Sequence, residues 1–97
     1  MSPVEAKSAI TLILTPAERE VLTYSAAGYT NPVIAAKLSK SVETVKHQLK
    51  HSYRKLGASN ATQAVLLALL VGEIDLGLLK KHLFRSWEAD QLLKGGT

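Results

Sequence analysis

The clearest signals in the sequence mark where helices begin and end, and they leave room only for short helices. In the segment LTPAEREVLTYSAAG, Thr15 suits the N-cap position, Pro16 suits the first helical position, and Glu18 stands where a capping box needs its carboxylate. Gly28 supplies the left-handed residue that commonly ends a helix. These signals predict a helix over residues 16–27.

Two further helices are expected at short intervals. Asn31 precedes a proline, which holds it out of the helical region and suits it to cap a short helix over residues 32–38. Ser41 is placed to cap a second helix over residues 42–56, and Gly57 ends that helix. Two short helices joined by a tight turn are typical of a helix-turn-helix.

The helix expected over residues 42–56 has one apolar edge and one cationic edge. The apolar positions recur at helical spacing; they are Val42, Val45, Leu49, Tyr53 and Leu56. The positions on the other side are Lys46, His47, Lys50, His51 and Arg54. This pattern predicts a helix that is fixed to the core along one edge and presents positive charge along the other.

The C-terminal part of the chain predicts two more helices. The segment ATQAVLLALLV is apolar almost all round, so a helix there has one face for its own core and another that needs a partner. Beyond Gly72, the residues Leu76, Leu79, Leu83 and Trp87 recur at helical spacing and predict an amphipathic helix. The chain is therefore expected to be all-α.

Length and composition limit the kind of protein. The chain has 97 residues, enough for one small domain. It has no cysteine, which excludes a disulfide framework and a thiolate metal site. The first residues lack the pattern of a secretory signal, and no apolar run is long enough to span a bilayer. We therefore expect a soluble intracellular protein that does not contact a membrane.

Positive charge is concentrated in one stretch. The formal net charge is +4, and between Lys37 and Lys55 six basic residues accompany only one acidic residue, Glu43. A solvated helix face is the ordinary explanation of a charged run, but such a face intersperses both signs. The imbalance instead favours a polyanion as the partner, and a helix-turn-helix fits double-stranded DNA.

The two histidines of the cationic edge raise the alternative of a metal site. His47 and His51 are four residues apart, as in the metalloprotease motif H-E-x-x-H, but Gln48 stands where that motif has its glutamate base. The remaining histidine, His82, lies in another segment, and the neighbouring lysines repel a dication. We therefore expect neither a metal nor a cofactor. No arrangement of catalytic residues is visible, so we do not expect an enzyme.

Beyond these patterns, the segment LTPAEREVL…SNATQAV resembles the DNA-binding domain of the LuxR/GerE family, which NarL- and FixJ-type response regulators share. The resemblance rests on motifs in family order, among them TPAEREVL, the Gly28 turn, TVK, RKLG and SNATQAV. It implies a four-helix domain over residues 14–72, in which the third helix reads DNA and the fourth dimerises. Residues 1–13 then form an N-terminal arm, and residues 73–97 form an additional helical extension.

The resemblance also implies roles for individual residues. The expected contacts with base edges come from Lys46, His47 and Lys50. The expected contacts with phosphates come from Thr30, Asn31, Lys40, Ser41, Thr44, His51 and Arg54. The expected dimer interface consists of Ala64, Val65, Ala68 and Leu69. Plainer roles stand beside these, since Asn31 also suits a helix cap and Thr44 an ordinary first-turn position. His47 and Gln48 depart from the residues usual after TVK, so the resemblance implies no base preference.

The function expected from these observations is transcription regulation by a dimer that binds double-stranded DNA in the cytoplasm, at the nucleoid of a bacterium or as the product of a phage. An alternative keeps the fold but makes residues 73–97 or the helix over residues 61–71 a docking surface for transcription machinery or for another regulator.

The extension beyond the family domain is the second open point. Family members usually carry a receiver or sensing domain before this one, and residues 1–13 have no room for it. We expect control through abundance, a partner or residues 73–97. Phe84 and Trp87 are expected to pack back over the dimer helix, and an exposed docking helix is the other interpretation.

Overall fold

The computed structural model describes residues 13–93 and shows five helices in that part of the chain. They are α2 (Pro16–Ala26), α3 (Asn31–Leu38), α4 (Val42–Leu56), α5 (Ala61–Leu70) and α6 (Leu76–Leu93). Residues 13–93 contain no strand, so the expected all-α fold is confirmed. The expected N-terminal arm, apart from Ile13, and the last four residues lie outside the described range.

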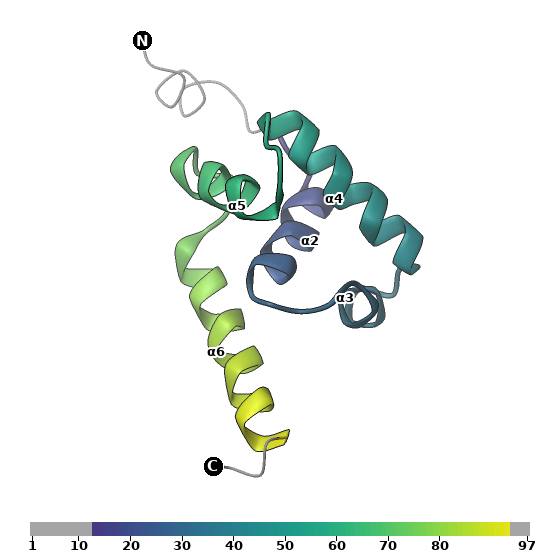
Figure 1. Ribbon diagram of the computed structural model, residues 1–97, viewed down its shortest axis with the longest axis vertical. Coiled ribbons are helices and arrows are strands. Elements are labelled where there is room, and N and C mark those ends of the chain that lie inside the picture. The colour runs from purple at the N-terminus through teal and green to yellow at the C-terminus, as the bar shows by residue number, and fades with distance from the viewer. Residues whose placement is uncertain (1–12, 94–97) are drawn as a thin grey trace.

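Helix α2 lies at the centre and packs against each of the other four helices. Figure 1 shows α3 and α4 on one side of α2 and α5 and α6 on the other. Val21 and Leu22 of α2 are completely buried, and burial of a side chain of this size contributes about 1.5–3 kcal/mol. None of the helices in residues 13–93 is both long enough and apolar enough to cross a membrane.

The hydrophobic core draws on all five helices and on the segments between them. Its buried members are Leu14, Val21, Leu22, Ala27, Ile34, Ala35, Val45, Leu49, Ala64, Ala68, Ile74 and Leu79. All five apolar positions predicted for one edge of α4 lie in this core or pack against it with partial burial, and Leu49 is 6% exposed. The core therefore fixes α4 along the edge that its sequence pattern predicts.

Local hydrogen bonds confirm most of the expected helix ends. The Thr15 hydroxyl accepts from the Glu18 backbone N–H at 3.1 Å, and the Glu18 carboxylate accepts from the Thr15 N–H at 2.8 Å, which completes the capping box. The Ser41 hydroxyl accepts from the Thr44 N–H at 3.0 Å. Gly57 has a φ of 71° at the end of α4, a conformation that glycine adopts without steric cost.

Helix α3 begins one residue earlier than expected. Its N-cap is Thr30, not Asn31, and the Thr30 side chain makes no capping hydrogen bond. The Thr30 carbonyl accepts from the Ile34 N–H at 2.9 Å, which is the first hydrogen bond of the helix. Asn31 is therefore inside the helix although it precedes Pro32, so the local preference of a residue before proline is overridden here.

A buried carboxylate joins the beginning of the described chain to the turn between α5 and α6. The Glu73 side chain is completely buried. It accepts hydrogen bonds from the backbone N–H groups of Ile13 and Leu14, and its Oε2 lies 3.5 Å from the Arg19 guanidinium. Residues that are about 60 positions apart are thereby tied together. Nothing in the sequence pattern predicted this contact.

The face of α6 that packs on α2 differs from the predicted apolar stripe. Leu79 is buried, at 8% exposed, but the neighbours that complete the packed face are His82 and Ser86. The His82 ring lies 4.6 Å from the Tyr24 ring, centroid to centroid, and the Ser86 hydroxyl lies beside Gly28. Burial, followed by the charges of Arg85, Lys81 and Lys37, lowers the pKa of His82. A face that combines the apolar Leu79 with the polar His82 and Ser86 thus holds α6 to α2.

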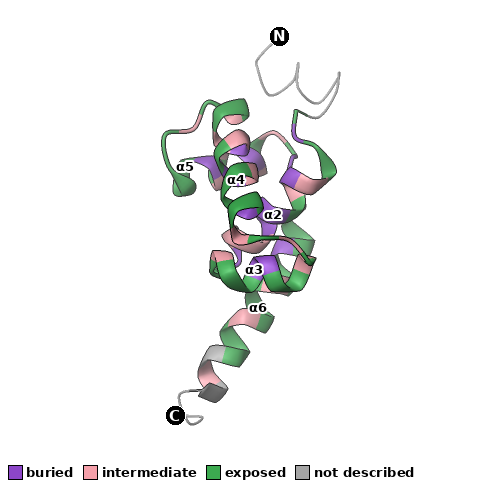
Figure 2. Cartoon of the chain, turned by 90° about the vertical axis from the view of Figure 1, so that its right-hand side faces the viewer, coloured by how far each residue is buried: buried purple, intermediate pink, exposed green. Residues whose placement is uncertain are grey.

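The remaining members of the predicted stripe face outward. Leu76, Leu83 and Trp87 are 65%, 50% and 57% exposed, and Phe84 is 55% exposed. The expectation that Phe84 and Trp87 pack back over the preceding helix is therefore wrong. Figure 2 shows that α6 extends beyond the rest of the molecule and is mostly exposed or intermediate along its length.

Candidate nucleic-acid interface

Helices α3 and α4 pack against each other and are joined by a tight turn. Ser39 takes a left-handed conformation in this turn, with a φ of 54°, and the Lys40 N–H donates to the Ala35 carbonyl at 2.9 Å. The turn sets α4 at an angle to α3, as Figure 1 shows. Two helices in this arrangement form a helix-turn-helix.

The two edges of α4 have opposite character. Val45 and Ser52 are completely buried, and the buried Ser52 hydroxyl donates a hydrogen bond to the Gln48 carbonyl at 2.8 Å. The opposite edge faces solvent, where Lys46, His47, Lys50 and Arg54 are all exposed. Sequence periodicity predicted this division, except that Ser52 is a polar member of the buried edge.

One cation of the expected cluster, although partly exposed, forms an ion pair with another helix. The Lys55 ammonium lies 2.7 Å from Oε1 of Glu18, the residue that also closes the capping box of α2. Burial alone would raise the pKa of Glu18, but hydrogen bonds from Lys55 and Thr15 and the charge of Lys55 outweigh it and lower the pKa. This ion pair ties the end of α4 to the beginning of α2.

Three other lysines are partly engaged. The Lys40 ammonium donates to the Gln48 side chain at 2.9 Å, and the Lys46 ammonium lies 3.7 Å from the Glu43 carboxylate in an exposed pair. An exposed pair of this kind is worth about 0–1 kcal/mol, so Lys46 can exchange it for another anion. The Lys37 ammonium lies 5.1 Å from the centre of the Tyr29 ring, and its charge helps to lower the pKa of His82 on α6.

Lys50 and Arg54 form no ion pair with any residue in the range 13–93. They are exposed one turn apart on α4. Each of the other four basic residues between Lys37 and Lys55 forms an ion pair, a side-chain hydrogen bond or a contact with an aromatic ring. The free positive charge of this surface is therefore smaller than a count from the sequence suggests.

The two histidines of α4 lie side by side. The rings of His47 and His51 are 4.2 Å apart, centroid to centroid, and inclined at 43°. Within residues 13–93, no group of three or more side chains of the metal-binding types comes together. His47 is exposed and His51 is half-buried, so only His47 is fully open to a partner.

The remaining candidate contacts gather at the two helix N-termini. Thr30 and Asn31 lie at the beginning of α3, and Ser41 and Thr44 lie at the beginning of α4. The Ser41 and Thr44 hydroxyls are 2.8 Å apart and bond each other. Backbone N–H groups at helix N-termini favour anions, so these two helix ends are electrostatically suited to an anionic partner.

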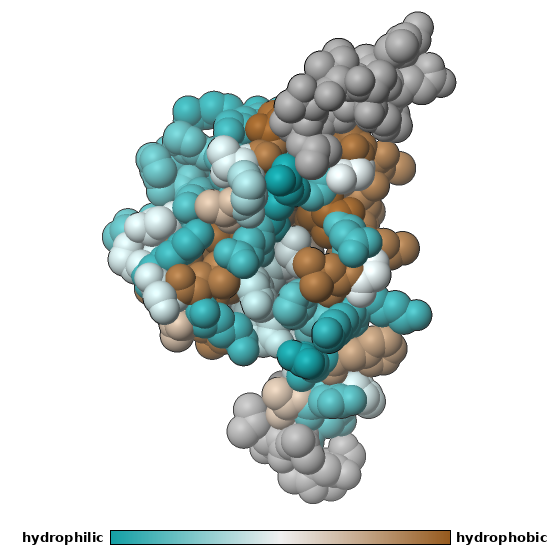
Figure 3. Space-filling model, turned by 180° about the vertical axis from the view of Figure 1, so that it is seen from behind, coloured by the Kyte–Doolittle hydropathy of each residue, from teal (hydrophilic) through white to brown (hydrophobic). Residues whose placement is uncertain are grey.

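Two of the four residues expected at a dimer interface cannot be reached by a second copy. Ala64 and Ala68 are completely buried in the core of their own chain, and only Val65 and Leu69 are partly exposed. The apolar side chains that α5 turns outward are those of Leu66 and Leu70, 57% and 67% exposed. Figure 3 shows hydrophobic residues gathered on the side of the molecule that carries α5 and hydrophilic residues gathered on the side that carries α4.

Comparison with known proteins finds similar regulators of transcription. The chain is 52% identical over 54 residues to the probable transcriptional regulatory protein SgaR of Hyphomicrobium methylovorum, a match that covers 56% of this chain and 26% of SgaR. It is 41% identical over 75 residues to the transcriptional activator protein EsaR of Pantoea stewartii subsp. stewartii, with 77% of this chain and 29% of EsaR covered. The chain thus spans roughly a quarter to 30% of the length of these relatives.

A third relative is the HTH-type quorum sensing-dependent transcriptional regulator RpaR of Rhodopseudomonas palustris, 44% identical over 63 residues, with 65% of this chain and 26% of RpaR covered. No solved structure gives a match of comparable strength. The family model described as bacterial regulatory proteins of the luxR family matches residues 12–68, which include α2 to α4 and most of α5. The chain therefore belongs to the luxR family of bacterial regulatory proteins.

Proposed function

We propose that the chain is a sequence-specific regulator of transcription that binds double-stranded DNA, with α4 in the major groove and α3 across the phosphate backbone. The observation that carries the proposal is the exposed edge of α4, where Lys46, His47, Lys50 and Arg54 face solvent while the other edge is fixed in the core. Such a regulator acts in the bacterial cytoplasm, where the nucleoid lies.

The contacts divide into base readout and backbone positioning. Lys46, His47 and Lys50 are proposed to reach base edges, because lysine bonds guanine O6 and N7 in the major groove. The residues proposed to contact phosphates are Thr30, Asn31, Lys40, Ser41, Thr44, His51 and Arg54. Five of these seven, all but His51 and Arg54, lie at or beside the N-termini of α3 and α4, where helix dipoles favour anions.

We further propose that two copies associate through α5. The outward side chains of Leu66 and Leu70 would lead this contact, with the partly exposed Val65 and Leu69 beside them. Each copy then binds one half-site, about one helical turn of DNA from the other. The operator expected for such a dimer is a short inverted repeat.

Selection from a randomised duplex library, followed by salt titration of the selected duplex, tests the DNA contacts. The double variant Lys46→Ala/Lys50→Ala should lose the inverted repeat. Each phosphate contact that is lost should reduce the slope of log K against log salt by about 0.9. A matched control is Lys81→Ala/Arg85→Ala, which removes the same charge from α6 on the far side of α2 and should keep the motif and its affinity ranking. Recovery of the same repeat by both variants would overturn the proposal.

A second candidate function is docking to transcription machinery or another regulator through α6 or α5, without DNA readout. The exposure of Phe84 and Trp87 on α6 favours it. The two functions separate by mutation: docking tolerates loss of Lys46 and Lys50 but fails with Trp87→Ala or, for α5, with Leu69→Asp. DNA readout has the opposite sensitivity to the lysine substitutions.

A further inference from the structure

Helix α6 carries an apolar surface that no other described part of the chain covers. Leu76, Leu83, Phe84 and Trp87 are each at least half exposed, and Leu83, Phe84 and Trp87 line a shallow open hollow of about 320 Å³. Because α6 packs mainly against α2 through its other side, this surface is open to solvent. Four large apolar side chains on one exposed helix are typical of a binding surface.

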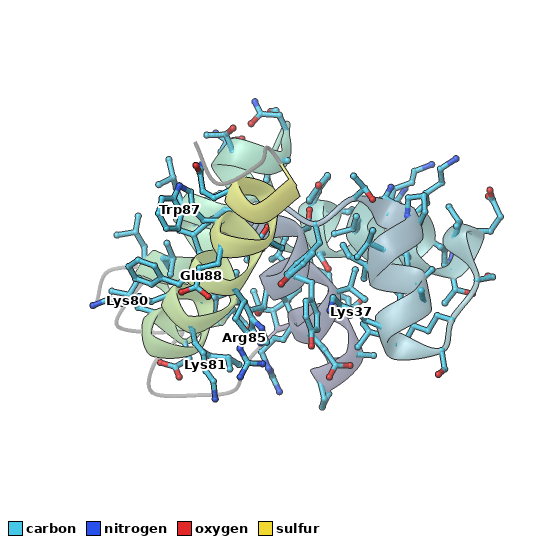
Figure 4. All side chains as sticks on the ribbon, turned by 90° about the horizontal axis from the view of Figure 1, so that it is seen from below. Lys37, Lys80, Lys81, Arg85, Trp87 and Glu88 are labelled. Carbon is cyan, nitrogen blue, oxygen red and sulfur yellow. The ribbon has the colours of Figure 1, made fainter. Side chains whose placement is uncertain are left out.

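Two opposite charges lie within and beside this surface. Lys80 is one helical turn from both Leu76 and Phe84, and Glu88 is one turn beyond Phe84. Lys80 and Glu88 are both exposed, and neither forms an ion pair with another residue of the range 13–93. Figure 4 shows Lys80 and Trp87 directed outward from α6. A partner that covers the apolar side chains removes water from these charges, so it must supply a carboxylate and a cation in return.

A second α6 meets this requirement. Lys80 and Glu88 stand four residues before and four residues after Phe84. When two such helices run antiparallel about a two-fold axis at Phe84, Lys80 of each copy comes opposite Glu88 of the other. The same operation brings Lys80 close to the indole of Trp87 in the second copy, which attracts a cation. The surface is thus complementary to itself, as a two-fold interface requires.

We propose that α6 binds α6 of a second copy of this chain in this antiparallel arrangement, with Leu83 and Phe84 at the axis and the Lys80–Glu88 pairs on either side. The contact is separate from the one proposed for α5 and does not depend on DNA binding. Because α6 and α4 lie on opposite sides of α2, the exposed edge of α4 stays free. A chain that uses both contacts would join two DNA-bound dimers.

Sedimentation equilibrium of the full chain without DNA tests the charge pairing. Lys80→Glu and Glu88→Lys each place like charges opposite one another twice, so each should weaken association through α6 about tenfold or more. The combined variant Lys80→Glu/Glu88→Lys restores opposite charges and should return within about threefold of the wild type. Lys50→Glu makes the same charge change on α4 and should leave association unchanged.

Trp87 gives a second reading because it is the only tryptophan in the chain. Its emission should shift to shorter wavelength as the wild-type concentration rises, and the Lys80→Glu variant should need about tenfold more protein for the same shift. Association that survives both single reversals but is abolished by Leu66→Glu would belong to α5 and overturn the proposal. Trp87 emission that stays independent of protein concentration would also overturn the proposal, and would indicate that this surface binds a different macromolecule.

Discussion

The substitution Glu73→Gln should destabilise the fold more than any exposed change of equal size. The amide has nearly the shape of the carboxylate, so packing is preserved while the charge is removed. Its oxygen can still accept from the backbone N–H groups of Ile13 or Leu14, which the carboxylate holds in the wild type. Its NH₂ group has no lone pair to offer the Arg19 guanidinium, which lies 3.5 Å from Oε2.

The magnitude follows from the burial of the two partners. The Glu73 side chain is 0% exposed, whereas the Arg19 side chain is 27% exposed and can turn toward water. Breaking a fully buried ion pair costs about 3–5 kcal/mol, and the access of Arg19 to water reduces this cost to about 2–3 kcal/mol. For a domain of this size, that loss lowers Tm by about 10–20 °C.

Thermal and urea unfolding followed by far-UV circular dichroism measure this loss. Glu20→Gln is the matched control, because Glu20 is an exposed carboxylate on the same helix as Arg19, and it should change the free energy of unfolding by less than about 0.5 kcal/mol. A Glu73→Gln protein as stable as the Glu20→Gln protein would show that the carboxylate does not hold the beginning of the described chain to the α5–α6 turn.

Two further substitutions test the turn and the ion pair that position α4. Ser39→Gly should raise the free energy of unfolding by about 0.5–1 kcal/mol in urea titrations, because Ser39 has a φ of 54° and glycine takes that conformation without strain; no gain would refute the strain. The lowered pKa of Glu18 means that its contribution to stability is complete above its ordinary value of 4.5 and is lost as the pH falls through the folded-state value. Lys55→Met should remove about 0.5–1 kcal/mol at pH 7, since Lys55 is about one third exposed, and the loss should shrink toward pH 3; an equal loss at both pH values would contradict the role of the pair.

The helix ends were predictable from sequence because their signals are local. The Thr15–Glu18 capping box, the Ser41 cap and the Gly57 stop each involve residues within one helical turn, so the sequence contains all the partners. The predicted N-cap of α3 was wrong by one residue, Asn31 instead of Thr30, because two adjacent polar residues both suit a cap.

The faces of the last two helices were not predictable in the same way. Helix α5 is apolar almost all round, so periodicity does not tell that Ala64 and Ala68 face the core and Leu66 and Leu70 face outward. In α6 the apolar stripe is present, but periodicity alone does not show whether the stripe packs on the same chain or faces outward. The packed side instead contains His82 and Ser86, whose partners on α2 and beyond it come from a distant part of the chain.

The structure also changes how the positive charge between Lys37 and Lys55 should be counted. Lys55 is held by Glu18, Lys40 by Gln48, and Lys37 lies against Tyr29. The counterions released on binding come from the DNA, in proportion to the phosphates that protein cations neutralise, and a lysine already held by another group of the protein is less available to neutralise one. The salt dependence of binding should therefore follow the less attached residues, Lys50 and Arg54 together with Lys46, and be weaker than the count of six cations implies.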